Sequence, residues 1–324
     1  MKGLHHIVLE TGRLKYEFDI KRNITIVLGD SATGKTTLIG LLSEYAMRHE
    51  ASGITLKSDV PCEVYNGFQD MWSLILSSMH NSIVFIDEGN SFIFTEEFAA
   101  HVSKSDNYYV LITRKPIHNL PYSINEIYGI RTTGKFHFPE KIYHEFYPII
   151  SNNSFLKDIY DNVVIVTEDT GSGYQFFSQA LNSKCSAVGG NSKFYRFIRT
   201  MKPEQKTVVI ADGAAFGAYV DSILDLRDMG YNISIYLPES FEWIILKSGV
   251  IKTDNINEVL ANPERYIESS IYFSWERFFA DYLRNSTKND SMRRYDKGKL
   301  SEYYTKGQVR TDILSVLPDV LRNI

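Results

Sequence analysis

Cysteine is scarce in this sequence, with Cys62 and Cys185 the only two among 324 residues. Two cysteines exclude a disulfide framework and a four-thiolate zinc site, and such low usage is typical of a reducing compartment. The sequence has no apolar run approaching the ~20 residues that cross a bilayer. Its N-terminus also lacks the apolar core of a secretory signal. We therefore expect a cytoplasmic protein with no membrane segment.

An excess of positive charge is also missing, because the net charge is −4. Any contact with nucleic acid would therefore need a local basic patch rather than a global field. The hydrophobic fraction of 44% and the charged fraction of 23% are those of an ordinary globular protein. A chain of 324 residues is long enough for two compact domains and a small third one.

A glycine-rich segment at 29–36 matches the pattern GxxxxGK[ST]. It consists of Gly29, Asp30, Ser31, Ala32, Thr33, Gly34, Lys35 and Thr36, with Thr37 directly after it. A β-branched apolar stretch precedes it, and apolar residues at helical spacing follow. In such a strand–turn–helix unit the backbone N–H groups cradle phosphates, Lys35 reaches the β- and γ-phosphates, and Thr36 holds Mg²⁺. We expect the nine residues to bind ATP with Mg²⁺.

A second buried strand, Ile83–Ile86, ends in two acids, Asp87 and Glu88. Together with the glycine-rich segment, this arrangement resembles the P-loop NTPases. The resemblance implies that Asp87 supports Mg²⁺ and that Glu88 is the catalytic base that polarises the attacking water.

A third strand within 107–115 ends in Thr113 and Arg114. In ATPases of the additional-strand type, which this region resembles, a polar residue here senses the γ-phosphate, and we assign that role to Thr113. Arg114 is either an arginine finger or an ordinary polar strand end. The chain has no NKxD stretch that would select guanine, and no LSGGQ-like signature of a complete ABC-type ATPase.

Residues 121–150 alternate apolar and polar side chains, which predicts one or two short hairpins turning at Thr132–Gly134. They would complete a P-loop NTPase domain over 1–150. The polar segment 151–157 is the expected linker.

The next region, 158–250, alternates strands and helices, which predicts a parallel α/β sheet. We expect strands within 162–169, 185–191, 206–217 and 232–240, with helices within 171–183, 191–201 and 218–230. Glu168 and Asp212 end the first and third strands, at the sheet edge where such folds bind ligands.

Residues 163–246 resemble the Toprim domain of topoisomerases, primases and OLD-family nucleases. There a Glu ends the first strand and DxDxxG ends the third, so the resemblance implies that Glu168 and Asp212 hold Mg²⁺ and cleave a phosphodiester. An ATPase before a Toprim unit is the OLD-family layout. The second acid of DxDxxG is Ala214 here, so a ligand is lost. Its replacement would come from Asp169, Glu239 or Glu242.

We expect the last segment, 251–324, to be helical, with its aromatic residues in the core. Residues 285–310 hold seven basic and three acidic residues, a net charge of +4. This stretch is either a phosphate-contacting loop or a solvated charged loop.

Two interpretations follow from these patterns. In the first, ATP binding controls a Toprim-like, Mg²⁺-dependent nuclease acting on DNA or RNA, in phage defence or a mobile element. In the second, the protein is an ATP-switched regulator whose Toprim-like domain is inactive. A small-molecule P-loop kinase is less favoured, because no arginine-rich lid segment is present. Homo-oligomers or a partner protein are expected under either interpretation, with Arg114 or Arg131 completing a site across an interface.

Overall fold

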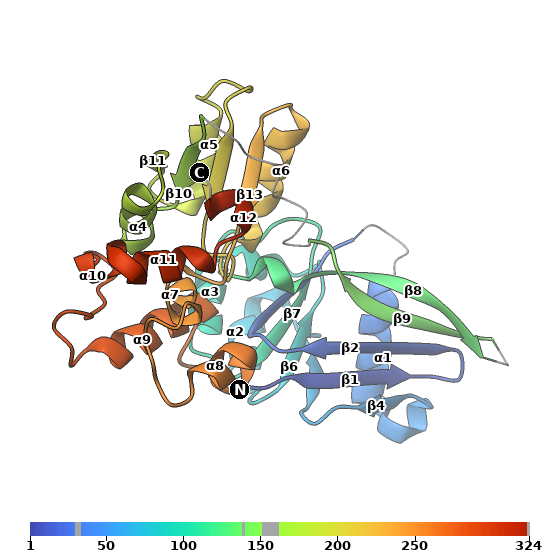
Figure 1. Ribbon diagram of the computed structural model, residues 1–324. Coiled ribbons are helices and arrows are strands. Elements are labelled where there is room, and N and C mark those ends of the chain that lie inside the picture. Colours follow the sequence, from blue (N-terminus) through green and yellow to red (C-terminus); the bar gives the residue numbers. More distant parts are fainter. Residues whose placement is uncertain (30–33, 138–139, 151–161, 323–324) are drawn as a thin grey trace. The chain divides into compact units, whose positions relative to one another are not determined.

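The computed structural model describes residues 1–29, 34–137, 140–150 and 162–322 (Figure 1). The chain divides into two compact units. Unit 1 consists of Met1–Ile150 and Asn262–Ser274, and unit 2 consists of Ser151–Ala261 and Trp275–Ile324. The expected helical segment 251–324 is therefore shared between the two units. Both units are α/β, as the sequence predicts.

Among the described residues, unit 1 is built on one nine-stranded mixed sheet in the order β4-β1-β2-β9-β8-β3-β7-β6-β5. Its strands are β1 (His5–Glu10), β2 (Leu14–Ile20), β3 (Ile24–Val27), β4 (Thr55–Lys57), β5 (Cys62–Val64), β6 (Ile83–Ile86), β7 (Tyr108–Ile112), β8 (Ile127–His137) and β9 (Lys141–Pro148).

Half of this sheet, β5-β6-β7-β3-β8, is parallel. Every residue of β3, β6 and β7 is buried. Continuous apolar runs of this kind are what parallel strands covered on both faces require. Because the strands run in the same direction, the segments that follow β3, β6 and β7 all leave from one edge.

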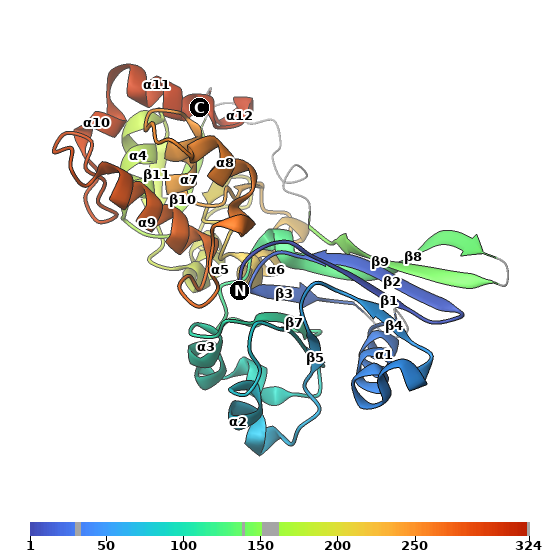
Figure 2. The ribbon, with the colours of Figure 1, turned by 90° about the horizontal axis from the view of Figure 1, so that it is seen from below.

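The other half is mainly antiparallel. β1 pairs with β2 and β4, and β8 pairs with β9. β9 runs parallel to β2, with Tyr16 opposite His144. Figures 1 and 2 both show β1, β2, β8 and β9 side by side.

The prediction of a turn at Thr132–Gly134 is wrong. β8 continues to His137, and the pairing register shifts between Thr132 and Phe136. Gly134, at φ +72°, lies within this irregular stretch, so the glycine accompanies a bulge and not a chain reversal.

Unit 1 contains three α-helices among its described residues, α1 (Lys35–Arg48), α2 (Trp72–Leu76) and α3 (Glu96–Val102). Leu38 and Leu42 of α1 belong to the same buried core as Val27 and Phe85 of the sheet. The segment 262–274 is part of this unit through backbone contacts. For example, the Gly3 N–H donates to the Glu264 carbonyl at 2.8 Å, and the Asn23 side chain adds a hydrogen bond to the Phe273 carbonyl at 2.8 Å.

Unit 2 contains a four-stranded, fully parallel sheet among its described residues, in the order β11-β10-β12-β13. Its strands are β10 (Val164–Thr167), β11 (Lys184–Ala187), β12 (Thr207–Ile210) and β13 (Ile233–Tyr236). The helices α4 (Ser172–Ala180), α5 (Phe194–Ile198) and α6 (Val220–Asp228) alternate with them. This confirms the predicted parallel α/β unit.

The strand order of unit 2 creates a reversal between β10 and β12. The chain first moves from β10 to β11 on one side and then crosses to β12 on the other. At such a point the two connections leave in opposite directions, which opens a crevice outside the carboxyl ends of the two strands. In unit 2, this crevice is therefore the position where a ligand is expected.

Six further helices complete unit 2 or follow its sheet in sequence. They are α7 (Phe241–Lys247), α8 (Ile256–Ala261), α9 (Trp275–Thr287), α10 (Glu302–Thr305), α11 (Gly307–Ser315) and α12 (Asp319–Arg322). α7 packs against α9. As predicted, Trp275, Phe278 and Phe279 are core residues. None of the described helices is long and apolar enough to cross a membrane.

The tightest backbone position near the reversal is Gly213. Its N–H donates to the Pro238 carbonyl at 2.6 Å, and a Cβ here would lie 2.6 Å from the Leu237 oxygen. We expect Gly213→Ala to lower the free energy of unfolding by about 1–3 kcal/mol, because backbone atoms must shift. Gly173→Ala is the control, since its Cβ would meet Phe241 at an ordinary 3.5 Å. Urea unfolding followed by circular dichroism distinguishes them, and equal stability of the two variants would contradict this packing.

Candidate functional site

In unit 1, the glycine-rich segment lies between β3 and α1. Asp30, Ser31, Ala32 and Thr33 are outside the described residues. Gly34 precedes α1 at φ +96°, a conformation that favours glycine. Lys35 is buried, and its ammonium donates to the Gly29 carbonyl. Thr36 and Thr37 are exposed on the first helical turn. In the described part, α1 thus begins at Lys35, whose ammonium binds the backbone of the residue that follows the strand β3 by two positions.

Two aromatic residues on strands of the sheet, which sequence analysis missed, support this turn. The Tyr16 hydroxyl donates to the Gly34 carbonyl at 2.9 Å. Its ring stacks on His144 with the centroids 4.6 Å apart. Burial raises the pKa of Tyr16 to about 12, so the hydroxyl stays protonated as a donor. No sequence motif connects these positions with the glycine-rich segment.

The acidic and sensor candidates follow the neighbouring strands β6 and β7. An Asp87 carboxylate oxygen accepts the Glu88 N–H at 2.8 Å. Buried Thr113 donates its hydroxyl to the Lys115 carbonyl at 2.9 Å, and its N–H bonds to Val27 at the end of β3 at 3.2 Å. The structure therefore brings Asp87, Glu88 and Thr113 to the same sheet edge as the glycine-rich segment.

The candidate base Glu88 is held by Arg114 in a two-point ion pair, with N–O distances of 2.8 and 2.9 Å. Both side chains are partly exposed, and pairs of this kind typically contribute about 1 kcal/mol or less. Arg114 can therefore release Glu88 at little cost. The other arginine candidate, Arg131, pairs with Glu145 at 2.8 Å.

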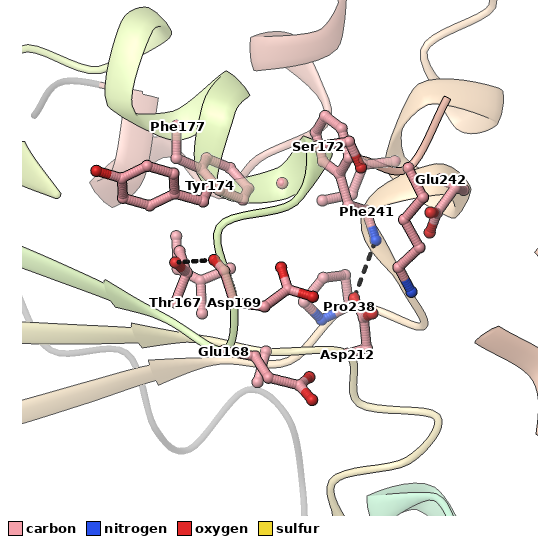
Figure 3. Close-up of a pocket in the computed structure, with 15 residues that line it drawn as sticks. Thr167, Glu168, Asp169, Ser172, Tyr174, Phe177, Asp212, Pro238, Phe241 and Glu242 are labelled. Carbon is pink, nitrogen blue, oxygen red and sulfur yellow. Dashed lines mark hydrogen bonds between the residues drawn. The ribbon is translucent and has the colours of Figure 1, made fainter. Parts of the chain in front are cut away.

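In unit 2, Glu168 directly follows β10 and Asp212 closely follows β12. Both line one cavity with a volume of ≈ 40 Å³, together with Glu242 and Lys297. Figure 3 shows Glu168 and Asp212 at the ends of neighbouring strands, with Glu242 on the helix beyond. The two acids chosen from sequence are thus brought together at the reversal in strand order.

Local backbone contacts fix each acid. The Glu168 carbonyl accepts the N–H groups of Gly189 and Gly190 at 2.7 and 2.8 Å. These glycines have φ of +79° and +125°, which only glycine adopts readily. An Asp212 carboxylate oxygen accepts the Phe241 N–H at 3.1 Å (Figure 3). Gly189 and Gly190 therefore hold the backbone of Glu168, and the N-terminus of α7 holds the side chain of Asp212.

Both carboxyl groups bind protons more tightly than usual. Burial, with Glu276 and Asp169 nearby, raises the pKa of Glu168 to about 7. Burial, with Glu276 and Glu242 nearby, raises the pKa of Asp212 well above its usual range. In both cases the Lys297 ammonium acts in the opposite direction. The acidic groups that line the site outnumber the lysine that lines it, and this crowding favours the protonated forms of Glu168 and Asp212.

Glu242 is a buried acid, only 1% exposed. One of its carboxylate oxygens accepts the Tyr295 hydroxyl, which also lies 2.6 Å from the Ser172 hydroxyl. The other oxygen has no hydrogen-bond partner among the described residues. A buried acceptor without a donor is costly, so this oxygen is available to a ligand in the cavity.

Sequence analysis missed two further members of the site, Glu276 on α9 and Lys297. The Lys297 ammonium donates to the Glu276 carboxylate. Burial opposes charge on Lys297, but Glu276, Asp212 and Glu242 raise its pKa overall. The stretch that contains Lys297 was noted only for its positive charge, and nothing local marks Glu276.

The residues fit a small oxygen-liganded cation only in part. Within the described chain, no group of three or more His, Cys, Asp or Glu side chains is arranged to hold a metal ion. Ala214, in place of the expected second acid, is buried. Mg²⁺, however, commonly takes one or two carboxylates and completes its shell with water. The cavity of ≈ 40 Å³ has room for a few water molecules and not for an organic ligand.

Comparisons with protein-family models, with curated proteins and with solved structures give no match to this chain. Function must therefore be argued from these residues and their geometry.

The pKa of Glu168 makes stability depend on pH. It rises from 4.5 to about 7 on folding, so between these values the folded state binds more protons than the unfolded state. The free energy of unfolding therefore falls as pH rises through this window, by up to about 3 kcal/mol. We expect Glu168→Gln to be more stable than wild type at pH 8 and similar to it at pH 5.

Urea unfolding at the two pH values measures this difference. Glu204→Gln, at an exposed position of the same unit, is the control and should track wild type. A Glu168→Gln variant that shows the same stability difference from wild type at both pH values would contradict the raised pKa of Glu168.

Proposed function

We propose that this protein binds and hydrolyses ATP in unit 1, and that its nucleotide state controls a Toprim-like, Mg²⁺-dependent nuclease site in unit 2. The combination follows the OLD-family layout, and the substrate class is DNA or RNA. The observation that carries the proposal is the meeting of Glu168 and Asp212 in one cavity at the reversal between β10 and β12.

The strand order of unit 1 supports the ATPase part. β7 lies between β3, which leads into the glycine-rich segment, and β6, which leads into Asp87. One strand, β7, thus separates β3 from β6. An extra strand at this place is the feature after which the additional-strand class of ATPases is named. Lys35, Asp87 and Thr113 then share one edge, where a γ-phosphate and its Mg²⁺ would lie.

In unit 2 the two carboxylates of Glu168 and Asp212 supply part of what metal-assisted hydrolysis of a phosphodiester needs, and water would complete the metal shell. Mg²⁺, when bound, neutralises phosphate charge and makes a coordinated water more acidic. Glu168 and Asp212 would hold it, with the free oxygen of Glu242 facing the same cavity. Without a cation, the pKa of Glu168 is raised to about 7, and a bound cation would favour the carboxylate form that a metal ligand requires. The Phe241 N–H keeps the Asp212 carboxylate oriented.

A second function, an ATP-switched regulator with an inactive Toprim-like unit, is favoured by one observation. Ala214 takes the place of the second acid, and the described residues supply no three-ligand set. The two functions differ in whether unit 2 cleaves nucleic acid, and they agree on unit 1.

Replacement of Lys35 tests unit 1 alone. We expect Lys35→Ala to weaken binding of a fluorescent ATP analogue about 100-fold or more, because a charged hydrogen-bonding partner of the phosphates is lost. Lys57→Ala, on exposed β4 of the same unit, should bind normally. Unchanged affinity of Lys35→Ala would show that ATP does not bind at this turn.

Cleavage assays test unit 2. Purified protein is incubated with supercoiled plasmid or single-stranded RNA, with Mg²⁺ or Mn²⁺, and with or without ATP. We expect metal-dependent cleavage that Glu168→Gln and Asp212→Asn abolish, and that Asp228→Asn, at an exposed position on α6, preserves. An absence of cleavage with intact ATP turnover would support the regulator. Cleavage that survives both substitutions would place the nuclease site elsewhere.

A further inference from the structure

A concentration of positive charge in unit 2 has no part in the site described above. Residues 184–206 hold six basic residues and one acid, so this segment has a net charge of +5 in a chain whose net charge is −4. Three of the six, Lys193, Arg196 and Arg199, are exposed and lie three residues apart along α5 and its two flanking residues. Residues three apart share one side of a helix. These three cations therefore form one face, which we call the α5 basic face.

The cations of this face are not neutralised by the protein itself. Among the described residues, no carboxylate forms an ion pair with Lys193, Arg196 or Arg199. The Arg199 guanidinium lies over the ring of Tyr195, 5.8 Å from its centroid. A guanidinium stacked in this way keeps its N–H donors at the edge, where they can bind an anion. The α5 basic face is therefore available to an anionic ligand.

Hydrogen bonds and packing hold α5 next to the segments that carry both acids of the cavity. The Lys193 N–H donates to the Gly190 carbonyl at 2.9 Å, and the Gly190 N–H donates to the Glu168 carbonyl at 2.8 Å. Buried Phe194 packs edge-on against Phe216, in the segment that follows β12, with the ring centroids 5.5 Å apart. Because β11 and β12 run in the same direction, the chain must return along α5 from one edge of the sheet to the other. The α5 basic face therefore begins beside the acids and leads away from them.

A polyanionic substrate needs cations at this place. Among the described residues, four acids and one lysine line the cavity, and that lysine, Lys297, donates to Glu276. These acids alone would repel an approaching phosphate backbone. Lysine and arginine side chains on the adjoining surface overcome such repulsion, because they neutralise phosphates and release the counterions condensed on them.

We propose that the α5 basic face binds the phosphate backbone of a nucleic acid strand and holds the strand beside Glu168 and Asp212. The inference rests on the proposed function, because it gives the substrate of unit 2 a path over the protein surface. It concerns binding, and it requires neither a metal ion nor cleavage. Contacts with phosphates carry no sequence information, so we expect binding that is independent of base sequence.

Fluorescence anisotropy with the full chain tests this. The probes are labelled single-stranded DNA and RNA oligonucleotides, measured in EDTA over a series of salt concentrations. We expect the triple variant Lys193→Gln, Arg196→Gln, Arg199→Gln to bind about 10- to 100-fold more weakly than wild type at ~0.1 M salt. The slope of log affinity against log salt should become shallower by about two, because three phosphate contacts are lost. The charge-conserving variant Lys193→Arg, Arg196→Lys, Arg199→Lys should keep the wild-type slope.

The matched control removes three charges from exposed positions of the other basic stretch, by Lys288→Gln, Arg294→Gln and Lys299→Gln. It should bind like wild type. Weakening by this control that equals or exceeds the weakening by the α5 variant would show a general charge effect or a strand bound at 285–310. Either result would overturn the role of the α5 basic face.

The outcomes also separate this inference from the proposed function. An unchanged affinity and salt slope in the α5 variant, with wild type binding normally, would overturn the inference and leave the nuclease proposal in place. Failure of wild type to bind either probe at low salt would contradict both. Arg196→Gln alone serves if the triple variant does not fold, with a slope expected to be shallower by about 0.7.

Discussion

Two partly buried acids, Glu168 and Asp212, lie at the ends of neighbouring parallel strands and constrain unit 2. A carboxylate removed from water is costly unless a proton, a cation or hydrogen bonds compensate it. The structure uses all three. Glu168 and Asp212 have raised pKa values, Lys297 supplies positive charge, and the Phe241 N–H binds Asp212. The Phe241 N–H gives Asp212 one structural role, and the cation proposed above would compensate both carboxylates further.

Unit 1 organises its candidate site in a different way. There the parallel half of the sheet brings the catalytic candidates to one edge, and the antiparallel half supplies Tyr16 and His144 against the turn at Gly34. A helix N-terminus binds phosphate through its free N–H groups, so its position relative to the acids matters. In the sheet order, β2 and β9, which carry this stacked pair, lie on one side of β3, and β6, which leads into the acids, lies on the other. The pair therefore holds the turn from the side away from the acids.

Much of the fold could be predicted because local signals were strong. The boundaries of β6 agree with the sequence, since a run of β-branched and aromatic residues stops at Asp87. The strands of unit 2 were found for the same reason. The hairpin turn was misplaced because Gly134 suggests a reversal as readily as a bulge. The pairing of β9 with β2, and the place of 262–274 in unit 1, depend on long-range contacts that leave no local pattern.

The candidate sites show the same division. Lys35, Asp87, Glu168 and Asp212 could be proposed as site residues from sequence, because the proposed chemistry comes with a fixed spacing or strand position. Tyr16, Glu276 and Lys297 were not, because they act through contacts made only on folding. Glu276 is the second residue of an amphipathic helix, where an acid is ordinary. Its role depends on the ammonium it binds, which comes from another segment.

The central claim is that Glu168 and Asp212 share a divalent cation. The most direct test is a crystal grown with Mn²⁺, whose anomalous scattering locates the ion independently of any assay. We predict a peak within about 2.0–2.4 Å of carboxylate oxygens from both Glu168 and Asp212. A cavity without such a peak, in crystals where Mn²⁺ is seen elsewhere on the chain, would contradict the claim.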